Sequence, residues 1–297
     1  MRVTYDTKIW KAFGLQSRVG PKVGIELEYE NAVIDDMPLE KIKKWHLEID
    51  HSLRGGGVEF VSMPLDPGQI NQALEEVQHC LSAVPAVVAN KRCGVHVHVN
   101  ALDLTFRELW SWLTYYQLVE AFIFKQYADG REENHFCVPQ WANTNMQQNL
   151  YSDATALYRG VSKTRAADEL VAGTFVPKGP VPLLMMSTSK YSAMNPSSLK
   201  QFGTLEFRQM RGTLSMAKVS EWAKFLVNLR DEAKSIGDAE EVLTEFENRG
   251  YERLCANIGL QQTNTVDPDD LTDCIDGAYM MVGHKPTNHQ DLTWEIS

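Results

Sequence analysis

Three short segments of the chain alternate polar and apolar residues with a period of two. They cover residues 24–30, 93–100 and 203–208, and each places carboxylates, imidazoles or a guanidinium between apolar residues. Successive side chains of a β-strand point to opposite faces of a sheet. The pattern therefore predicts three strands, each with one apolar face and one charged face.

The charged residues of each segment lie at every second position, so each set shares a face. These residues are Glu26, Glu28 and Glu30, then His96 and His98, then Glu206 and Arg208. If the three strands belong to one sheet, a single face gathers all of these groups. Such crowding is costly unless cations or ligands neutralise it. We therefore interpret this face as a metal and phosphate site.

Periodicity and turn signals predict the remaining elements. Strands are expected over 58–62, 187–195 and 203–210, and helices over 66–84, 105–128, 215–235 and 238–248. Strands with pairs of helices between them favour an α+β class, with an antiparallel sheet backed by helices. No linker divides the chain, so we expect one domain over residues 1–297. We interpret 130–185 as an insertion or lid and 262–297 as a C-terminal tail of unclear structure.

Composition narrows the possible partners. The chain has 297 residues, 43% of them hydrophobic, and a formal net charge of −10. An acidic chain without a Lys/Arg run gives no signal for nucleic-acid binding. No apolar run approaches the roughly 18 residues of a membrane span, and residues 1–13 lack a signal-peptide core. The five cysteines are widely spaced, which favours reduced thiols in a cytoplasmic protein.

Each candidate also has a structural interpretation. Glu59 interrupts an apolar strand and either faces water or joins the site, and Asp50 either forms a turn or has a functional role. His96 and His98 form an H-x-H motif, which also opens the metal site of many hydrolases. Glu206 with Arg208 is either a structural ion pair or part of an anion site, since arginine recognises phosphate in a fork geometry.

Residues beside the third strand extend the predicted anion site. Arg211 follows Arg208 in a turn and adds a second guanidinium. On the preceding strand, Lys190 can hold a phosphate or carboxylate, Tyr191 can stack on a base, and Asn195 completes the set. The chain has no glycine-rich phosphate-binding motif. A nucleotide would therefore bind through metals and arginine.

The ordered set of motifs resembles the amidoligase family, which belongs with glutamine synthetase and glutamate–cysteine ligase among the carboxylate–amine ligases. The motifs are G-x-E-x-E at 24–28, D-x-S-L at 50–53, E-F-V-S-x-P at 59–64, C-G-x-H-x-H at 93–98, K-Y-x-x-x-N at 190–195 and G-T-x-E-F-R at 203–208. The matches lie within residues 24–211, about two thirds of the chain.

The resemblance implies a curved antiparallel sheet of the glutamine synthetase type, with helices on its outer face and an ATP site with Mg²⁺ or Mn²⁺ ions on its concave face. It implies that Arg208 steadies the transferring phosphoryl group. The implied metal ligands are Glu26, Glu28, Glu59, Glu206 and one of His96 and His98.

The activity implied is ATP-dependent joining of a carboxylate to an amine through an acyl phosphate. The carboxylate and amine can be small molecules or peptides, and the sequence identifies neither them nor the oligomeric state. The amine must lose a proton to a base, for which Glu30, Asp50 and Glu59 are candidates. The alternatives are a metal-dependent hydrolase using the H-x-H motif, a non-catalytic binding relative, and a guanidino kinase within the ligase fold.

Overall fold

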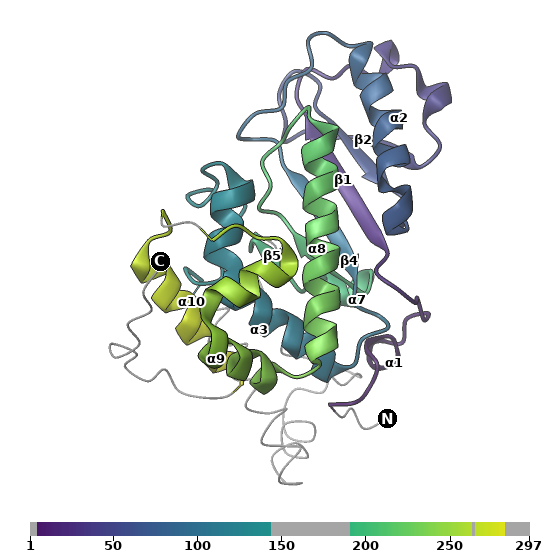
Figure 1. Ribbon diagram of the computed structural model, residues 1–297. Helices are drawn as coiled ribbons and strands as arrows, with labels where there is room; N and C mark the ends of the chain where they lie inside the picture. Colours follow the sequence, from purple (N-terminus) through teal and green to yellow (C-terminus); the bar gives the residue numbers. More distant parts are fainter. Residues whose placement is uncertain (1–4, 144–190, 263–264, 283–297) are drawn as a thin grey trace, which may run out of the picture.

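The fold is a six-stranded antiparallel sheet backed by helices, as seen in a computed structural model that describes residues 5–143, 191–262 and 265–282 (Figure 1). The strand order is β2-β3-β1-β4-β6-β5, and every neighbouring pair is antiparallel. The strands are β1 (Val23–Tyr29), β2 (Trp45–Ile49), β3 (Val58–Ser62), β4 (Val95–Asn100), β5 (Met194–Asn195) and β6 (Thr204–Phe207). The predicted α+β class is confirmed.

The helices pack mainly on the apolar face of the sheet. They are α1 (Ile9–Phe13), α2 (Ile70–Ser82), α3 (Phe106–Ile123), α7 (Ser198–Gln201), α8 (Met216–Ile236), α9 (Ala239–Ile258) and α10 (Pro268–Met281). Helix α8 crosses β1 and β4, and α3 packs on α8, α9 and α10 (Figure 1). Strand residues on this face, such as Ile25, Leu27 and Val97, are fully buried. Their burial is the main term that holds the sheet to the helices.

Short helical turns connect several elements. They are the 3-10 turns η1 (Ile34–Asp36), η2 (Leu39–Lys41) and η3 (Pro67–Gln69), and the π-helical turn η4 (Phe124–Ala128). Turn η3 begins α2 as the sequence predicts, with Pro at its first position. At α3, the predicted cap Thr105 accepts from the Glu108 N–H and donates its own N–H to the Glu108 carboxylate. This capping box satisfies two backbone donors at the start of the helix.

The structure differs from the sequence prediction at β2, β5, α9 and α10. Within the described part of the strand expected over 187–195, only β5 (Met194–Asn195) is a strand. Strand β2 is absent from the sequence prediction, although Trp45–Ile49 alternates apolar and polar residues with the period of two. The tail was expected to lack a clear element, yet α10 lies within it and packs on α3, where Trp110 Nε1 donates to the Met281 carbonyl at 2.9 Å. Helix α9 also continues beyond the predicted end at 248, across a break at Gly250, whose φ is 63°.

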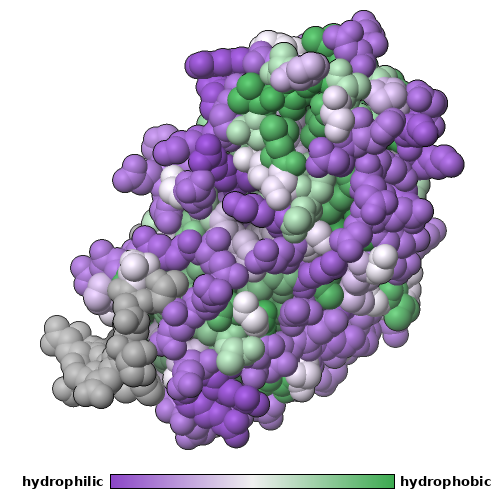
Figure 2. Space-filling view, turned by 45° about the horizontal axis from the view of Figure 1, so that its top comes forward, coloured by the Kyte–Doolittle hydropathy of each residue, from purple (hydrophilic) through white to green (hydrophobic). Residues whose placement is uncertain are grey.

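The surface in Figure 2 is mostly hydrophilic, with a hydrophobic patch in its upper part. Among the described helices, none combines the length and apolar character that crossing a bilayer requires. All five cysteines are buried and free, as the prediction of reduced thiols requires.

Candidate metal and anion site

Strand register brings the predicted residues together on one face of the sheet. Glu26 in β1 is opposite His96 in β4, and His98 is opposite Glu206 in β6. The prediction that three alternating segments form one charged face is therefore confirmed. On the other side of β1, Glu28 is opposite Glu59 of β3, so carboxylates continue across a fourth strand.

Glu26 lies between the two imidazoles of β4. Its Oε2 is 3.2 Å from His96 Nδ1, and its Oε1 is 3.1 Å from His98 Nε2. Burial raises the pKa of Glu26, but the interactions with both histidines outweigh it and hold the pKa well below its usual range. Burial lowers the pKa of His98, and the adjacent Glu26 carboxylate more than reverses this. Glu26 is thus a carboxylate anion in a site that favours its charge.

Two overlapping sets of ligand atoms suit metal ions. Glu26, His98 and Glu206 offer one set, and Glu26, Glu59 and His96 offer the other; the atoms within each set lie within 4.8 Å of one another. His98 Nε2 is buried and has no partner in hydrogen-bond geometry within the described chain, although Glu26 is near. Carboxylates and imidazoles in this arrangement can bind divalent cations.

Glu59 shows that negative charge accumulates on the β3 side of the site. Burial and the charges of Glu26 and Glu28 raise its pKa to about 8. A carboxyl group whose neighbours are also carboxylates gains most from a nearby cation. This side of the face therefore favours a metal ion rather than an anion.

Arg208 and Asn195 hold Glu206 in place. The Arg208 guanidinium donates to Glu206 Oε1, and Asn195 Nδ2 donates to Oε2 at 2.8 Å. Arg208 Nε also donates to the Phe136 carbonyl at 3.4 Å. Glu206 and Arg208 therefore form the ion pair that one interpretation of the sequence predicts, and this pair lies beside the candidate metal ligands.

Glu28 is held by the backbone at the start of β4. Its Oε2 accepts the Gly94 N–H at 2.6 Å, and its Oε1 lies 3.7 Å from His96 Nε2. Glu28 is absent from both sets of ligand atoms, although it borders them. Gly94 itself leaves room for this arrangement, because a Cβ there would lie 2.6 Å from His96 Nε2 and 3.1 Å from Arg131 Nη1.

Arg131 is a residue that sequence reasoning missed. It follows η4 in an irregular loop, where no period marks it, yet only 3% of it is exposed. The charges of Glu28 and Arg208 both act on it. Its one sequence signal is an arginine directly after the Asp129-Gly130 helix stop.

Two of the candidate bases are occupied by structural contacts. Glu30 is buried and accepts hydrogen bonds from Asn90 Nδ2 at 2.6 Å, Arg92 Nε at 3.0 Å and the Arg54 N–H at 3.2 Å. Asp50 accepts from the Ser52 N–H at 2.8 Å and the Ser52 hydroxyl at 2.9 Å. Asp50 is therefore a turn-former, although its charge also acts on Glu59.

Two of the predicted nucleotide contacts already have protein partners. Arg211 lies next to Gly94, but its guanidinium pairs with Asp129 at 2.5 Å. The Tyr191 ring packs on Phe136 with centroids 5.1 Å apart. Lys190 lies outside the described residues, as does most of the predicted lid at 130–185.

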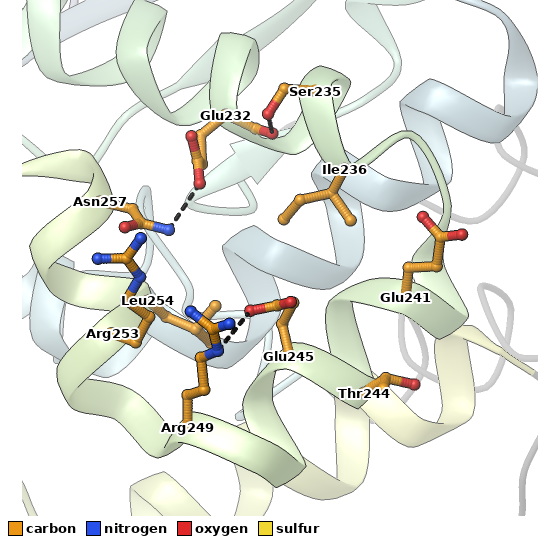
Figure 3. Close-up of a pocket in the computed structure, with 10 residues that line it drawn as sticks. All are labelled: Glu232, Ser235, Ile236, Glu241, Thr244, Glu245, Arg249, Arg253, Leu254 and Asn257. Carbon is orange, nitrogen blue, oxygen red and sulfur yellow. Dashed lines mark hydrogen bonds and ion pairs between the residues drawn. The ribbon is translucent and has the colours of Figure 1, made fainter.

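A separate hollow of about 430 Å³ lies between α8 and α9 (Figure 3). Four of its polar side chains form two separate pairs: Glu232 accepts a hydrogen bond from Asn257 at 2.7 Å, and Glu245 forms an ion pair with Arg249 at 3.4 Å (Figure 3). None of its lining residues comes from the sheet. The chemistry therefore centres on the charged sheet face.

Fold and site together define an α+β protein whose antiparallel sheet gathers carboxylates, imidazoles and guanidinium groups on one face. A family model described as "Putative amidoligase enzyme" matches residues 15–230. The chain belongs to this amidoligase family, which supports a ligase-type enzyme. No curated protein matches the chain.

Proposed function

We propose that this protein is an ATP-dependent carboxylate–amine ligase that forms an amide through an acyl phosphate. The observation that carries the proposal is the convergence of Glu26, His96, His98 and Glu206 from three strands beside Arg208. A face with both cation ligands and a guanidinium suits a metal-bound phosphate. We also propose that the sheet is of the glutamine synthetase type.

The donor set fits divalent cations such as Mg²⁺ or Mn²⁺. Glu26, Glu59, Glu206 and the two histidines would hold them, with Glu28 at the border of the set. When bound, such ions neutralise the charge on phosphate oxygens and so favour phosphoryl transfer. His98 supports the assignment, because its buried Nε2 lies 3.1 Å from Glu26 Oε1, and a metal ion would be held by both groups.

The protein's own residues then have distinct roles. Arg208 steadies the phosphoryl group as it passes to the substrate carboxylate, and Asn195 and the Glu206 ion pair orient Arg208 and the metal ligands. Glu30 is unsuited as the base, because three donors already occupy its carboxylate. Glu59 is therefore the proposed base for the attacking amine, because Ser52 already engages both carboxylate oxygens of Asp50.

Two further proposals concern the residues that contact the nucleotide and the segment that covers the site. We propose that Lys190, Tyr191 and Arg211 contact the nucleotide, and that residues 130–185 shield the intermediate from water. Within the described part of that segment, Val138 pairs with Tyr191 and Ala193 through two backbone hydrogen bonds of 2.8 Å. The described beginning of the segment therefore lies beside β5, next to Arg208.

The deciding experiment is an ATPase assay with Mg²⁺ across pools of acids and amines, with product mass recorded. We expect ADP and phosphate only when both a carboxylate and an amine are present, together with a product that has lost one water. Bond hydrolysis with Zn²⁺ and without ATP would favour the hydrolase alternative. A phosphorylated guanidino product would favour the kinase.

Glu28→Gln is the matched variant for this assay. We expect it to abolish turnover with the fold intact, because the amide keeps the shape of Glu28 but removes its charge. Glu75→Gln on α2 makes the same change at an exposed position outside the sheet and serves as control. Full turnover in Glu28→Gln would contradict its assignment to the site.

A further inference from the structure

Arg131 is a buried cation without a counter-ion in the described part of the chain. Its Nη1 donates to the Cys93 carbonyl at 3.2 Å and to the Met210 carbonyl at 3.0 Å. Its Nε is buried and has no hydrogen-bond partner. Buried charges in proteins are normally paired, because desolvation without a partner is costly. The arrangement therefore indicates a ligand anion.

The guanidinium lies at the edge of the metal and anion site. A methyl group at Gly94 would lie 3.1 Å from Arg131 Nη1 and 2.6 Å from His96 Nε2, so both groups border the same glycine. The negative charge of Glu28 and the positive charge of Arg208 both act on Arg131. The two arginines thus come from different segments, one just after β6 and the other in the loop after η4.

The backbone fixes this side chain before any ligand arrives. Cys93 lies just before β4, and Met210 lies after β6, where its carbonyl also accepts the Val95 N–H at 3.0 Å. Both carbonyls therefore belong to the ends of sheet strands. Only Nη1 of Arg131 donates within the described residues, and its buried Nε is closed to a ligand, which leaves Nη2. A guanidinium nitrogen donates to a phosphate oxygen in a charge-assisted hydrogen bond.

We propose that Arg131 binds the terminal phosphoryl group of the nucleotide, opposite Arg208, and so distinguishes ATP from ADP at this site. The inference rests on the proposed function, because that function supplies the phosphoryl group. Two guanidinium groups suit the doubly charged terminal phosphate better than a singly charged carboxylate. Arg131 acts in this role by direct contact with the ligand.

The test compares two Mg²⁺-nucleotides, ADP and the non-hydrolysable ATP analogue AMP-PNP, by titration calorimetry. In the wild type we expect tighter binding of AMP-PNP. In Arg131→Gln we expect that preference to fall about tenfold, the loss of one charge-assisted contact, with ADP affinity unchanged. Arg249→Gln, which removes an exposed arginine on α9, is the matched control and should change neither affinity.

The titration with ADP distinguishes a phosphate-binding role of Arg131 from a purely structural role. A residue that only ties Cys93 to Met210 would weaken both nucleotides equally or neither, and either result overturns the inference. If Arg131→Gln does not fold, Arg131→Lys is used instead, because lysine keeps a positive charge and a donor for the carbonyls. We expect this variant to lose part of the preference for AMP-PNP over ADP, and full retention of that preference overturns the proposed role of Arg131. Wild-type protein that binds neither nucleotide overturns the proposed function and this inference together. A preference that survives in Arg131→Gln overturns only the role of Arg131.

Discussion

Glu26 and His96 face each other across the β1–β4 ladder, with Oε2 of the carboxylate 3.2 Å from Nδ1 of the ring. The contact places a buried imidazole beside a carboxylate that also reaches His98. Glu26 is the residue shared by both sets of metal-ligand atoms. It is therefore the position at which a single change should disturb both.

Glu26→Gln is expected to weaken Mn²⁺ binding by at least about tenfold, the size of effect that loss of even an outer-shell partner causes. The amide lacks the negative charge that attracts the cation and offers one weaker ligand oxygen. The measurement is a titration followed by electron paramagnetic resonance of free Mn²⁺. Glu75→Gln, an exposed change on α2, should bind like the wild type. Equal affinity in the two variants would remove Glu26 from the ligand set.

Gly94→Ala is expected to lower Mn²⁺ affinity by about tenfold while the protein remains folded. The added Cβ would lie 2.6 Å from His96 Nε2, so the imidazole must move away from the other ligands. Calorimetry with Mn²⁺ and a circular dichroism spectrum check the two parts of this expectation. Gly68→Ala is the control, because a Cβ there meets nothing within 4 Å. Wild-type affinity in Gly94→Ala would show that His96 does not need its present position.

Glu120 gives the protein a pH-dependent stability that is independent of the site. It is fully buried in α3 and accepts from the Tyr116 hydroxyl at 2.5 Å and from the Gln140 N–H at 2.9 Å. Burial raises the pKa of Glu120 from 4.5 to about 8, and these hydrogen bonds oppose the rise only in part. The folded protein therefore keeps a proton that the unfolded chain releases.

The sign follows from this difference in protons. Below pH 4.5 both states are protonated and the stabilisation is complete, and as the pH rises toward about 8 the unfolded state is increasingly favoured. We expect the free energy of unfolding to fall by up to about 1.4 kcal/mol per pH unit in this window from Glu120 alone. Urea unfolding of wild type and Glu120→Gln across the window measures it. The variant should show a shallower slope, and identical slopes would contradict the raised pKa.

Glu30→Gln tests whether the third glutamate of β1 is structural. Burial raises the pKa of Glu30, but hydrogen bonds from Asn90, Arg54 and Arg92 outweigh it, so the pKa is lowered. Its stabilisation is therefore present at neutral pH and lost as the pH falls. We expect the variant to lose about 1–3 kcal/mol at neutral pH, with a smaller loss in acid. Mn²⁺ affinity should stay at the wild-type value; a selective loss of affinity would return Glu30 to the site.

The sequence by itself determined which side chains share a face. Glu26 and Glu28, His96 and His98, and Glu206 with Arg208 follow from the period of two, because alternation of side chains is a local property of extended backbone. It also determined the α+β class and the starts of α2 and α3, where Pro67 and Thr105 act within a few residues of themselves. The motifs in order were enough to indicate the amidoligase family.

Only the tertiary structure decided which of these side chains meet. That Glu26 faces both His96 and His98 depends on hydrogen bonds between strands about 70 residues apart in the chain, which no local pattern encodes. Only the structure shows that Glu30 is held by partners from separate turns and is unsuited as a catalytic base. Only the structure places Arg131 near the site, because its loop has no periodic pattern. The packing of helix α10 against α3 is likewise decided only by the tertiary structure, although the cap Asp267, Pro268 at the first position and the spacing of the buried residues mark the helix in the sequence.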